Sequence, residues 1–226
     1  MSFNGGKQYH IFKIKNNIYI DVFSSDESQE AFKNGTFYTK LDGANGYHLN
    51  GVLYERYDDR KCNFDPDNLP EEMMNIPRGE NVSIYEGHHY YYSKLDQMKA
   101  NKRMKKVYDK LYSQIEGMKN GSVEFVGPNF QMTPKYTKNT VVSHQTLSFD
   151  FPRQNRSFKN IKDYLLIGYE EGIVIEYKGK YWKIRANVYD KKCRFEMFKR
   201  SWINWKKGKG VTEDEKKLIE KLTHPK

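Results

Sequence analysis

The chain has 226 residues, a formal net charge of +10 at pH 7, 15% aromatic residues and two cysteines. This length suffices to bury a full core, and the longest apolar runs are too short to cross a bilayer, which excludes a helical membrane protein from our expectations. The excess of positive charge and of aromatic rings favours nucleic acid as a partner, unless the lysines only keep the surface soluble.

The cysteines and the first residues favour an intracellular protein. Cys62 and Cys193 have no close Cys or His at metal-ligand spacing, which argues against a zinc site and a disulfide framework. The polar start of the chain lacks the apolar core of a secretory signal. We therefore expect a cytoplasmic protein that makes no membrane contact. We also expect a monomer, although no sequence feature sets the oligomeric state.

The first part of the chain predicts strands joined by turns. Residues 8–23 alternate apolar and polar side chains, as two short strands do, and residues 23–35 are interpreted as a loop. Residues 35–43 predict a strand that enters a turn at Asp42-Gly43. This turn, on its own, makes Lys40 an ordinary solvated lysine.

A strong hairpin signal follows at Asn50-Gly51. This two-residue turn pairs Leu49 with Val52 and, counting back, Asn45 with Arg56. That register brings Arg56 back toward the segment that contains Lys40.

The remaining elements alternate between helices and strands. Residues 60–80 contain three prolines and predict an irregular segment, and residues 93–117 predict an amphipathic helix. A serine cap and a closing glycine mark another helix at 157–168. The other predicted elements are a strand at 122–127, mixed short strands and loops at 133–155, a hairpin at 171–189, and a terminal helix at 212–222 with a Thr212–Glu215 capping box. The fold class is therefore α+β with antiparallel sheets.

Five short motifs carry the chemistry. They are, in chain order, "KLDG" at Lys40, the hairpin arginine Arg56, "VEFVGP" with Glu124, "EEGIVIEY" with Glu171, and "YWKIRANVY" with Lys183. A single K-x-D-G motif is weak evidence, but the ordered set is specific.

This order resembles the covalent nucleotidyltransferase superfamily, which comprises ATP-dependent ligases and capping guanylyltransferases. The blocks "LYERYD", "VEFVGPNFQMTPK", "SHQTLSF", "SFKNIKDYLL" and "EGIVIEYKGKYWKI" resemble most closely the small 5′-to-3′ RNA ligases related to the vertebrate enzyme. The similarity extends from about residue 18 to about residue 190. It implies an ATP-grasp-like nucleotidyltransferase domain of antiparallel sheets flanked by helices over residues 1–190, followed by a short basic and aromatic extension at 191–226.

The resemblance implies residue roles. Lys40 is the adenylated nucleophile, Glu171 binds metal or activates the lysine, and Lys183 contacts the α-phosphate of ATP. Arg56 contacts nucleotide or RNA phosphate, and Glu124 holds the ribose hydroxyls. Asp42 and Gly43 complete the nucleotide-binding motif. Mg²⁺, with Mn²⁺ as the alternative, is the implied metal.

The chemistry needs a free amine on the nucleophile. An ordinary lysine has a pKa near ~10.4 and is mostly protonated at neutral pH. Cations such as Lys183 and Arg185 are expected to favour the free amine and to neutralise the α-phosphate as pyrophosphate leaves. Many superfamily members carry lysine where this chain has Arg185, so the role of Arg185 stays open.

The requirement that Lys183 and Glu171 face one side sets the predicted register of the last hairpin. A two-residue turn at Lys178-Gly179 pairs Val174 with Lys183 and separates Lys183 from Glu171. A three-residue loop instead pairs Ile173 with Lys183 and Glu171 with Arg185. We expect the three-residue loop.

Several residues keep two interpretations. Phe130 and Tyr136 stack on adenine or only pack in the core, and His144 lines the site or satisfies a core hydrogen bond. His88 and His89 favour loop or packing roles over metal binding. Residues 195–210 interleave basic and aromatic side chains, which suits RNA contact as well as a packed face with solvated lysines.

The expected function is an ATP-dependent RNA ligase that joins RNA 5′-phosphate and 3′-hydroxyl ends. The alternatives are another covalent nucleotidyltransferase, either a DNA ligase or a capping guanylyltransferase, and a basic RNA-binding module without catalysis.

Overall fold

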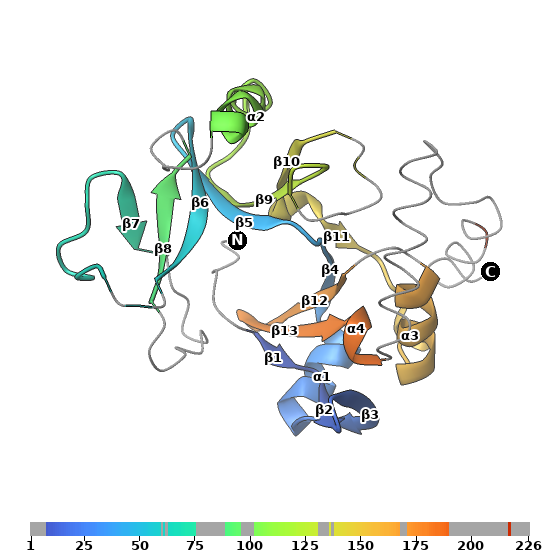
Figure 1. Cartoon of the computed structure of the whole chain (residues 1–226). Coiled ribbons are helices and arrows are strands. Elements are labelled where there is room, and N and C mark those ends of the chain that lie inside the picture. Colours follow the sequence, from blue (N-terminus) through green and yellow to red (C-terminus); the bar gives the residue numbers. More distant parts are fainter. Residues whose placement is uncertain are drawn as a thin grey trace. The chain divides into compact units, whose positions relative to one another are not determined.

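The computed structural model describes residues 8–59, 61, 63–75, 89–95, 102–130, 136, 138–167, 171–189 and 217. These residues form an α+β structure with four helices, drawn in Figure 1. The described chain divides into two compact units. Unit 1 takes the described residues that fall within 43–130 and 138–146, and unit 2 takes those within 8–42 and 147–189 together with residues 136 and 217.

Unit 2 contains a five-stranded sheet and a separate two-stranded hairpin. The sheet order is β1-β13-β12-β4-β11. Its strands are β1 (Tyr9–His10), β4 (Thr36–Lys40), β11 (Ser148–Phe149), β12 (Gly172–Tyr177) and β13 (Lys180–Arg185), and the hairpin is β2 (Phe12–Lys15) with β3 (Ile18–Phe23). The pairing of β1 with β13 is parallel, so the expectation of purely antiparallel sheets is wrong for this edge. The other three adjacent pairs in the sheet are antiparallel.

The sheet of unit 2 has one apolar and one polar face because side chains alternate along a strand. Phe37, Ile173, Ile175, Trp182 and Ile184 are all buried on the apolar face and belong to one hydrophobic cluster. The cluster also takes in Phe32 of α1 and Leu165 of α3. The alternate positions of the same strands are left to form the polar face.

Unit 2 contains three of the helices: α1 (Asp26–Asn34), α3 (Phe158–Ile167) and α4 (Ala186–Tyr189). The predicted helix with a serine cap is confirmed in α3, where the Asn160 backbone N–H donates to Ser157 Oγ at 3.1 Å.

Helix α1 corrects the prediction of a loop at residues 23–35. Ser25 and Ser28 form a capping box, since each side chain accepts a hydrogen bond from the backbone N–H of the other. Acidic residues occupy the first turn and Lys33 the last, as the helix dipole favours. Only a narrow stripe of this helix is buried, so its apolar period is short and easily missed in the sequence.

The turns of unit 2 include one confirmed prediction and one correction. The hairpin β2–β3 turns at Asn16 and Asn17, both with positive φ, as predicted for residues 8–23. The hairpin β12–β13 turns at Lys178 (φ 51°) and Gly179 (φ 75°), with Val174 opposite Lys183. The predicted three-residue loop is therefore wrong, and the two-residue turn is the one that forms.

Unit 1 contains a six-stranded antiparallel sheet in the order β10-β9-β5-β6-β8-β7. Its strands are β5 (Ala44–Leu49), β6 (Val52–Asp59), β7 (Met73–Asn75), β8 (His89–Lys94), β9 (Gly121–Val126) and β10 (Thr140–Ser143). The hairpin at Asn50-Gly51 is confirmed: both residues have positive φ and Leu49 lies opposite Val52. The paired residues of β5 and β6 extend from Leu49–Val52 to Gly46–Glu55, one position short of the predicted pair Asn45–Arg56.

Helix α2 (Lys102–Tyr112) covers one face of this sheet. Tyr108 and Leu111 pack in a cluster with Leu53, Val123 and Phe125. The prediction of a helix from residue 93 places its start too early, because Ser93 and Lys94 are the last residues of β8. The predicted irregular segment at 60–80 contains the short strand β7.

Several expectations concern residues that lie outside the described part of the chain. They include Cys62, Cys193, His88 and residues 191–226 apart from Lys217, which is helical. Within the described residues, no helix is both long enough and apolar enough to span a membrane.

Candidate active site

The polar face of unit 2 brings together Lys40, Lys183 and Arg185. Tyr38 of β4 lies opposite Val174 of β12, which in turn lies opposite Lys183 of β13. Residues directly opposite in antiparallel strands share a face, as do residues two apart in one strand. Lys40 and Arg185 therefore lie on the same face as Lys183, one step along the strands. The two-residue turn, which we predicted would separate Lys183 from Glu171, leaves Lys183 and Arg185 on the face that carries Lys40.

Glu171 joins this face because it precedes the ladder of β12. The strand begins at Gly172, and Glu171 is held by the backbone bond from Ala186 N–H to its carbonyl oxygen at 2.9 Å. Its carboxylate contacts two cations: Oε2 accepts a hydrogen bond from Lys40 Nζ, and Oε1 lies 2.7 Å from Arg185 Nη2. The Glu171 side chain is 15% exposed and the Lys40 side chain 26% exposed. The alternation argument that excluded Glu171 fails because it assumed a regular strand at this residue.

The close approach of neighbouring strands requires a glycine at position 172, directly after Glu171. It lies opposite Lys40 on one side and Arg185 on the other. A Cβ atom at this position would approach the backbone oxygen of Ile184 to 1.9 Å. A side chain here would force β12 and β13 apart, and with them the residues that hold Glu171.

A network of hydrogen bonds to Tyr19 and His10 holds the backbone of Arg185 in place. The Arg185 backbone N–H donates to the Tyr19 hydroxyl at 3.2 Å, and that hydroxyl also hydrogen bonds to His10 Nδ1. His10 lies opposite Lys183 in the parallel pair β1–β13. Burial, with the positive charges of Lys183 and Arg185, lowers the pKa of His10 from 6.5 to about 4. His10 is therefore neutral at pH 7, and its Nδ1 can accept the Tyr19 proton.

The sequence interpretation missed His10 and Tyr19. His10 and Tyr19 reach Lys183 and Arg185 only because segments far apart in the chain meet in unit 2, and no local sequence pattern indicates that these segments meet. Their polar side chains within a strand-forming segment were the only available signal.

Unit 1 holds Glu124 on β9, again on a polar sheet face. Its carboxylate Oε2 lies 3.0 Å from His144 Nε2, and the other ring nitrogen of His144 lies 2.7 Å from Ser122 Oγ. An ionised carboxylate can only accept, so His144 Nε2 is the donor. Glu124 Oε1 accepts no hydrogen bond within the described part of the chain. His144 thus hydrogen bonds to both Glu124 and Ser122, and its role in lining a nucleotide site stays a prediction.

Arg56 is exposed on β6, on the same face as Tyr92 of β8, which lies opposite it. Its guanidinium carbon lies 5.5 Å from the ring centroid of Tyr90. The Tyr92 hydroxyl donates to Asn45 Oδ1 at 3.0 Å, and Asn45 lies opposite Glu124. Within unit 1, Arg56 and Glu124 therefore share one face of the sheet.

The Lys-x-Asp-Gly motif spans the boundary between the units. Lys40 and Asp42 belong to unit 2, and Gly43 belongs to unit 1. A Cβ atom at Gly43 would lie 2.5 Å from the Phe125 backbone oxygen and 2.7 Å from the Glu124 side chain. This position therefore requires glycine because β9 passes close to the backbone.

Phe130 is half-buried, and its assignment to adenine stacking stays a prediction. Its ring stacks on Phe125 with centroids 5.7 Å apart and packs against the hydrophobic cluster of unit 1. Tyr136 is half-buried, and its assignment to adenine stacking stays a prediction.

The site in unit 2 presents cations around a single carboxylate, that of Glu171. Within the described residues, no group of three His, Cys, Asp or Glu side chains could hold a metal ion. Mg²⁺ keeps several waters and binds one or two carboxylates together with substrate phosphates, which a single Glu171 can satisfy. The Arg185 Nε–H is buried without a hydrogen-bond acceptor among the described residues.

We compared the chain with known proteins. A scan against models of protein families gives no match, and a search of curated protein sequences gives none either.

Proposed function

We propose that this protein is an ATP-dependent RNA ligase that works through a covalent lysyl-AMP intermediate. The observation that carries the proposal is the arrangement around Glu171, whose two oxygens contact Lys40 Nζ and Arg185 Nη2. The order of sequence motifs, which resembles that of the nucleotidyltransferase superfamily, supports it.

The first step uses the residues of unit 2. Lys40 Nζ attacks the α-phosphorus of ATP, the bond between the α-phosphorus and the bridging oxygen breaks, and pyrophosphate leaves. Glu171 would take the proton that Nζ must lose, and the hydrogen bond from Nζ to its Oε2 supports this role. Arg185 and Lys183 are placed to stabilise the negative charge that develops on the phosphates. Mg²⁺, or Mn²⁺ in its place, would be held by Glu171 and phosphate oxygens and would supply further charge neutralisation.

The later steps transfer the nucleotide and close the strand. The RNA 5′-phosphate takes AMP from Lys40, and the phosphorus–nitrogen bond breaks. A 3′-hydroxyl then attacks the activated 5′-phosphate, and AMP leaves. Glu124 would accept hydrogen bonds from the ribose hydroxyls through Oε1, which accepts none from the described residues, and Arg56 would contact a phosphate.

Intact-mass measurement after incubation with ATP and Mg²⁺ tests the first step. The expected result is a gain of one adenylyl group on the wild type and none on Lys40→Ala. Lys180→Ala is the matched control, because Lys180 is on β13 but pairs with Glu27 at 2.6 Å, away from Glu171. An unmodified wild type would refute the proposal.

A second experiment separates the ligase from the other candidate functions. Labelled ATP or GTP is offered first, and a nicked RNA or a nicked DNA follows. Adenylation with sealing of RNA supports the proposal. Guanylation without sealing indicates a capping enzyme, and sealing of DNA alone indicates a DNA ligase.

A further inference from the structure

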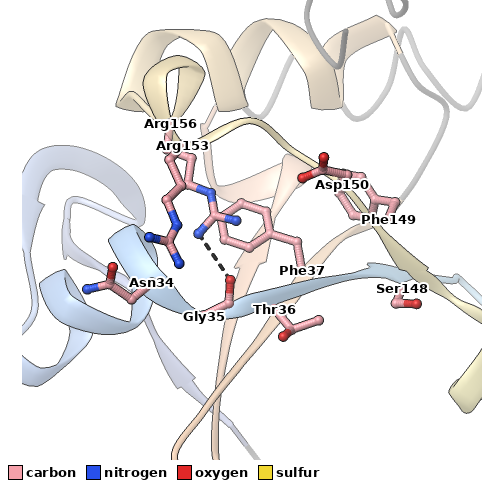
Figure 2. Close-up of a pocket in the computed structure, with 9 residues that line it drawn as sticks. All are labelled: Asn34, Gly35, Thr36, Phe37, Ser148, Phe149, Asp150, Arg153 and Arg156. Carbon is pink, nitrogen blue, oxygen red and sulfur yellow. Dashed lines mark hydrogen bonds between the residues drawn. The ribbon is translucent and has the colours of Figure 1, made fainter.

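A separate pocket in unit 2 lies beside the beginning of β4 (Figure 2). It has a volume of about 440 Å³, within the range of small-ligand sites. Its lining comes from the junction of α1 and β4, from β11, and from the short helical turn η2 (Arg153–Asn155) with the residue after it. The lining residues are Asn34, Gly35, Thr36, Phe37, Ser148, Phe149, Asp150, Arg153 and Arg156.

Arg156 is rigidly held at the wall of this pocket. Its Nη1 donates to the backbone oxygens of Phe32, Lys33 and Gly35 at 3.1, 2.9 and 3.0 Å. Its Nε donates to the Phe151 oxygen at 2.9 Å, and the guanidinium lies 4.1 Å from the Phe37 ring centroid. The remaining nitrogen, Nη2, makes no hydrogen bond within the described residues. This leaves a fixed donor for a ligand.

Arg153 adds a second positive charge next to the first. Its side chain is exposed and forms no hydrogen bond or ion pair within the described part of the chain. Burial lowers the pKa of Arg156, and the charge of Arg153 lowers it further, while Asp150 acts in the opposite direction. Figure 2 shows both arginine side chains toward Asn34 and Gly35, with Asp150 across the pocket. Two guanidinium groups at one pocket suit an anion, and Asp150 is the carboxylate that lines the same pocket.

The pocket and Lys40 lie at opposite ends of the strand β4. Thr36 at the pocket and Lys40 at the end of β4 are four residues apart on the same strand, which is roughly 13 Å at the rise of a β-strand. Thr36 shares the polar face with Lys40, whereas Phe37, whose ring the Arg156 guanidinium contacts, lies on the apolar face of the sheet.

We propose that this pocket binds one nucleotide of the RNA strand, with its phosphate between Arg153 and Arg156. This rests on the proposed function, because it names a contact for the RNA that Lys40 would adenylate. Asp150 offers an acceptor for the 2′-hydroxyl, which DNA lacks. The pocket volume accommodates a single nucleotide unit.

The test measures RNA affinity without ATP. Fluorescence anisotropy follows a 5′-phosphorylated single-stranded RNA with wild type, Arg153→Gln and Lys159→Gln. Lys159 is the control because it lies on α3 outside the pocket and pairs with Asp163. Arg153→Gln is expected to weaken binding about fivefold to tenfold and to reduce the salt slope by about one. Lys159→Gln is expected to stay within about twofold of the wild type.

The outcomes separate the two proposals. Unchanged affinity of a folded Arg153→Gln protein would overturn the pocket assignment. Weaker binding of AMP without weaker binding of RNA would also overturn it, because the ligand would then be a free nucleotide. Failure of Lys40 adenylation in the wild type would refute the ligase, while the anisotropy result would stand by itself.

Discussion

Replacing Gly172 with alanine tests whether the close approach of β12 and β13 holds the cluster around Glu171. The new Cβ would lie 1.9 Å from the Ile184 oxygen, whereas carbon and oxygen normally approach to roughly 3.3 Å. One strand must therefore move by about 1.4 Å, which breaks the bond from Ala186 N–H to the Glu171 oxygen and at least one neighbouring ladder bond. The two lost hydrogen bonds cost ~1 kcal/mol each, and the strain costs about 1–3 kcal/mol. Alanine also lowers the entropy of the unfolded chain, which offsets part of this cost. The net destabilisation is therefore about 3 kcal/mol.

Urea unfolding of wild type, Gly172→Ala and Gly179→Ala measures this effect. Gly179 is in the same hairpin with φ +75°, and no atom lies within 4 Å of the place that a Cβ would take, so its substitution costs only the conformational penalty of about 1 kcal/mol. Lys40 adenylation is expected to fall in Gly172→Ala because Glu171 loses its position. Equal midpoints for the two variants would refute the steric argument.

Three other predictions concern stability. Ser25→Ala removes the capping box of α1 and is expected to cost about 1 kcal/mol in urea unfolding, whereas an unchanged midpoint would contradict the role of the cap. His144→Ala leaves Glu124 and Ser122 without their common partner and is expected to cost about 1–3 kcal/mol, with Gln145→Ala on the exposed neighbour as control. The folded-state pKa of His10 is lowered from 6.5 to about 4, so its contribution to stability is present above pH 6.5 and is lost as the pH falls toward 4. His10→Asn should flatten the stability profile between these pH values, and an unchanged slope would show that another group titrates.

The local signals that the sequence contains predicted most of the elements. Asn50-Gly51 specified its hairpin because both positions accept positive φ at low cost, and Ser157 specified the start of α3 because its hydroxyl accepts a backbone hydrogen bond. Alternating apolar residues predicted the strands around Lys40, Glu124 and Lys183. These features depend on a few neighbouring residues, which is why sequence alone determines them.

Tertiary structure decided the register and the partners at the site. Lys178 is an unfavourable residue for positive φ, yet β12 pairs with both β4 and β13, and these two ladders outweigh the preference of one turn residue. Glu171 reaches Lys40 and Arg185 because it leaves the ladder, and His10 lies opposite Lys183 through a parallel pairing between distant segments. Such contacts arise from packing between residues far apart in the chain, so no local pattern determines them.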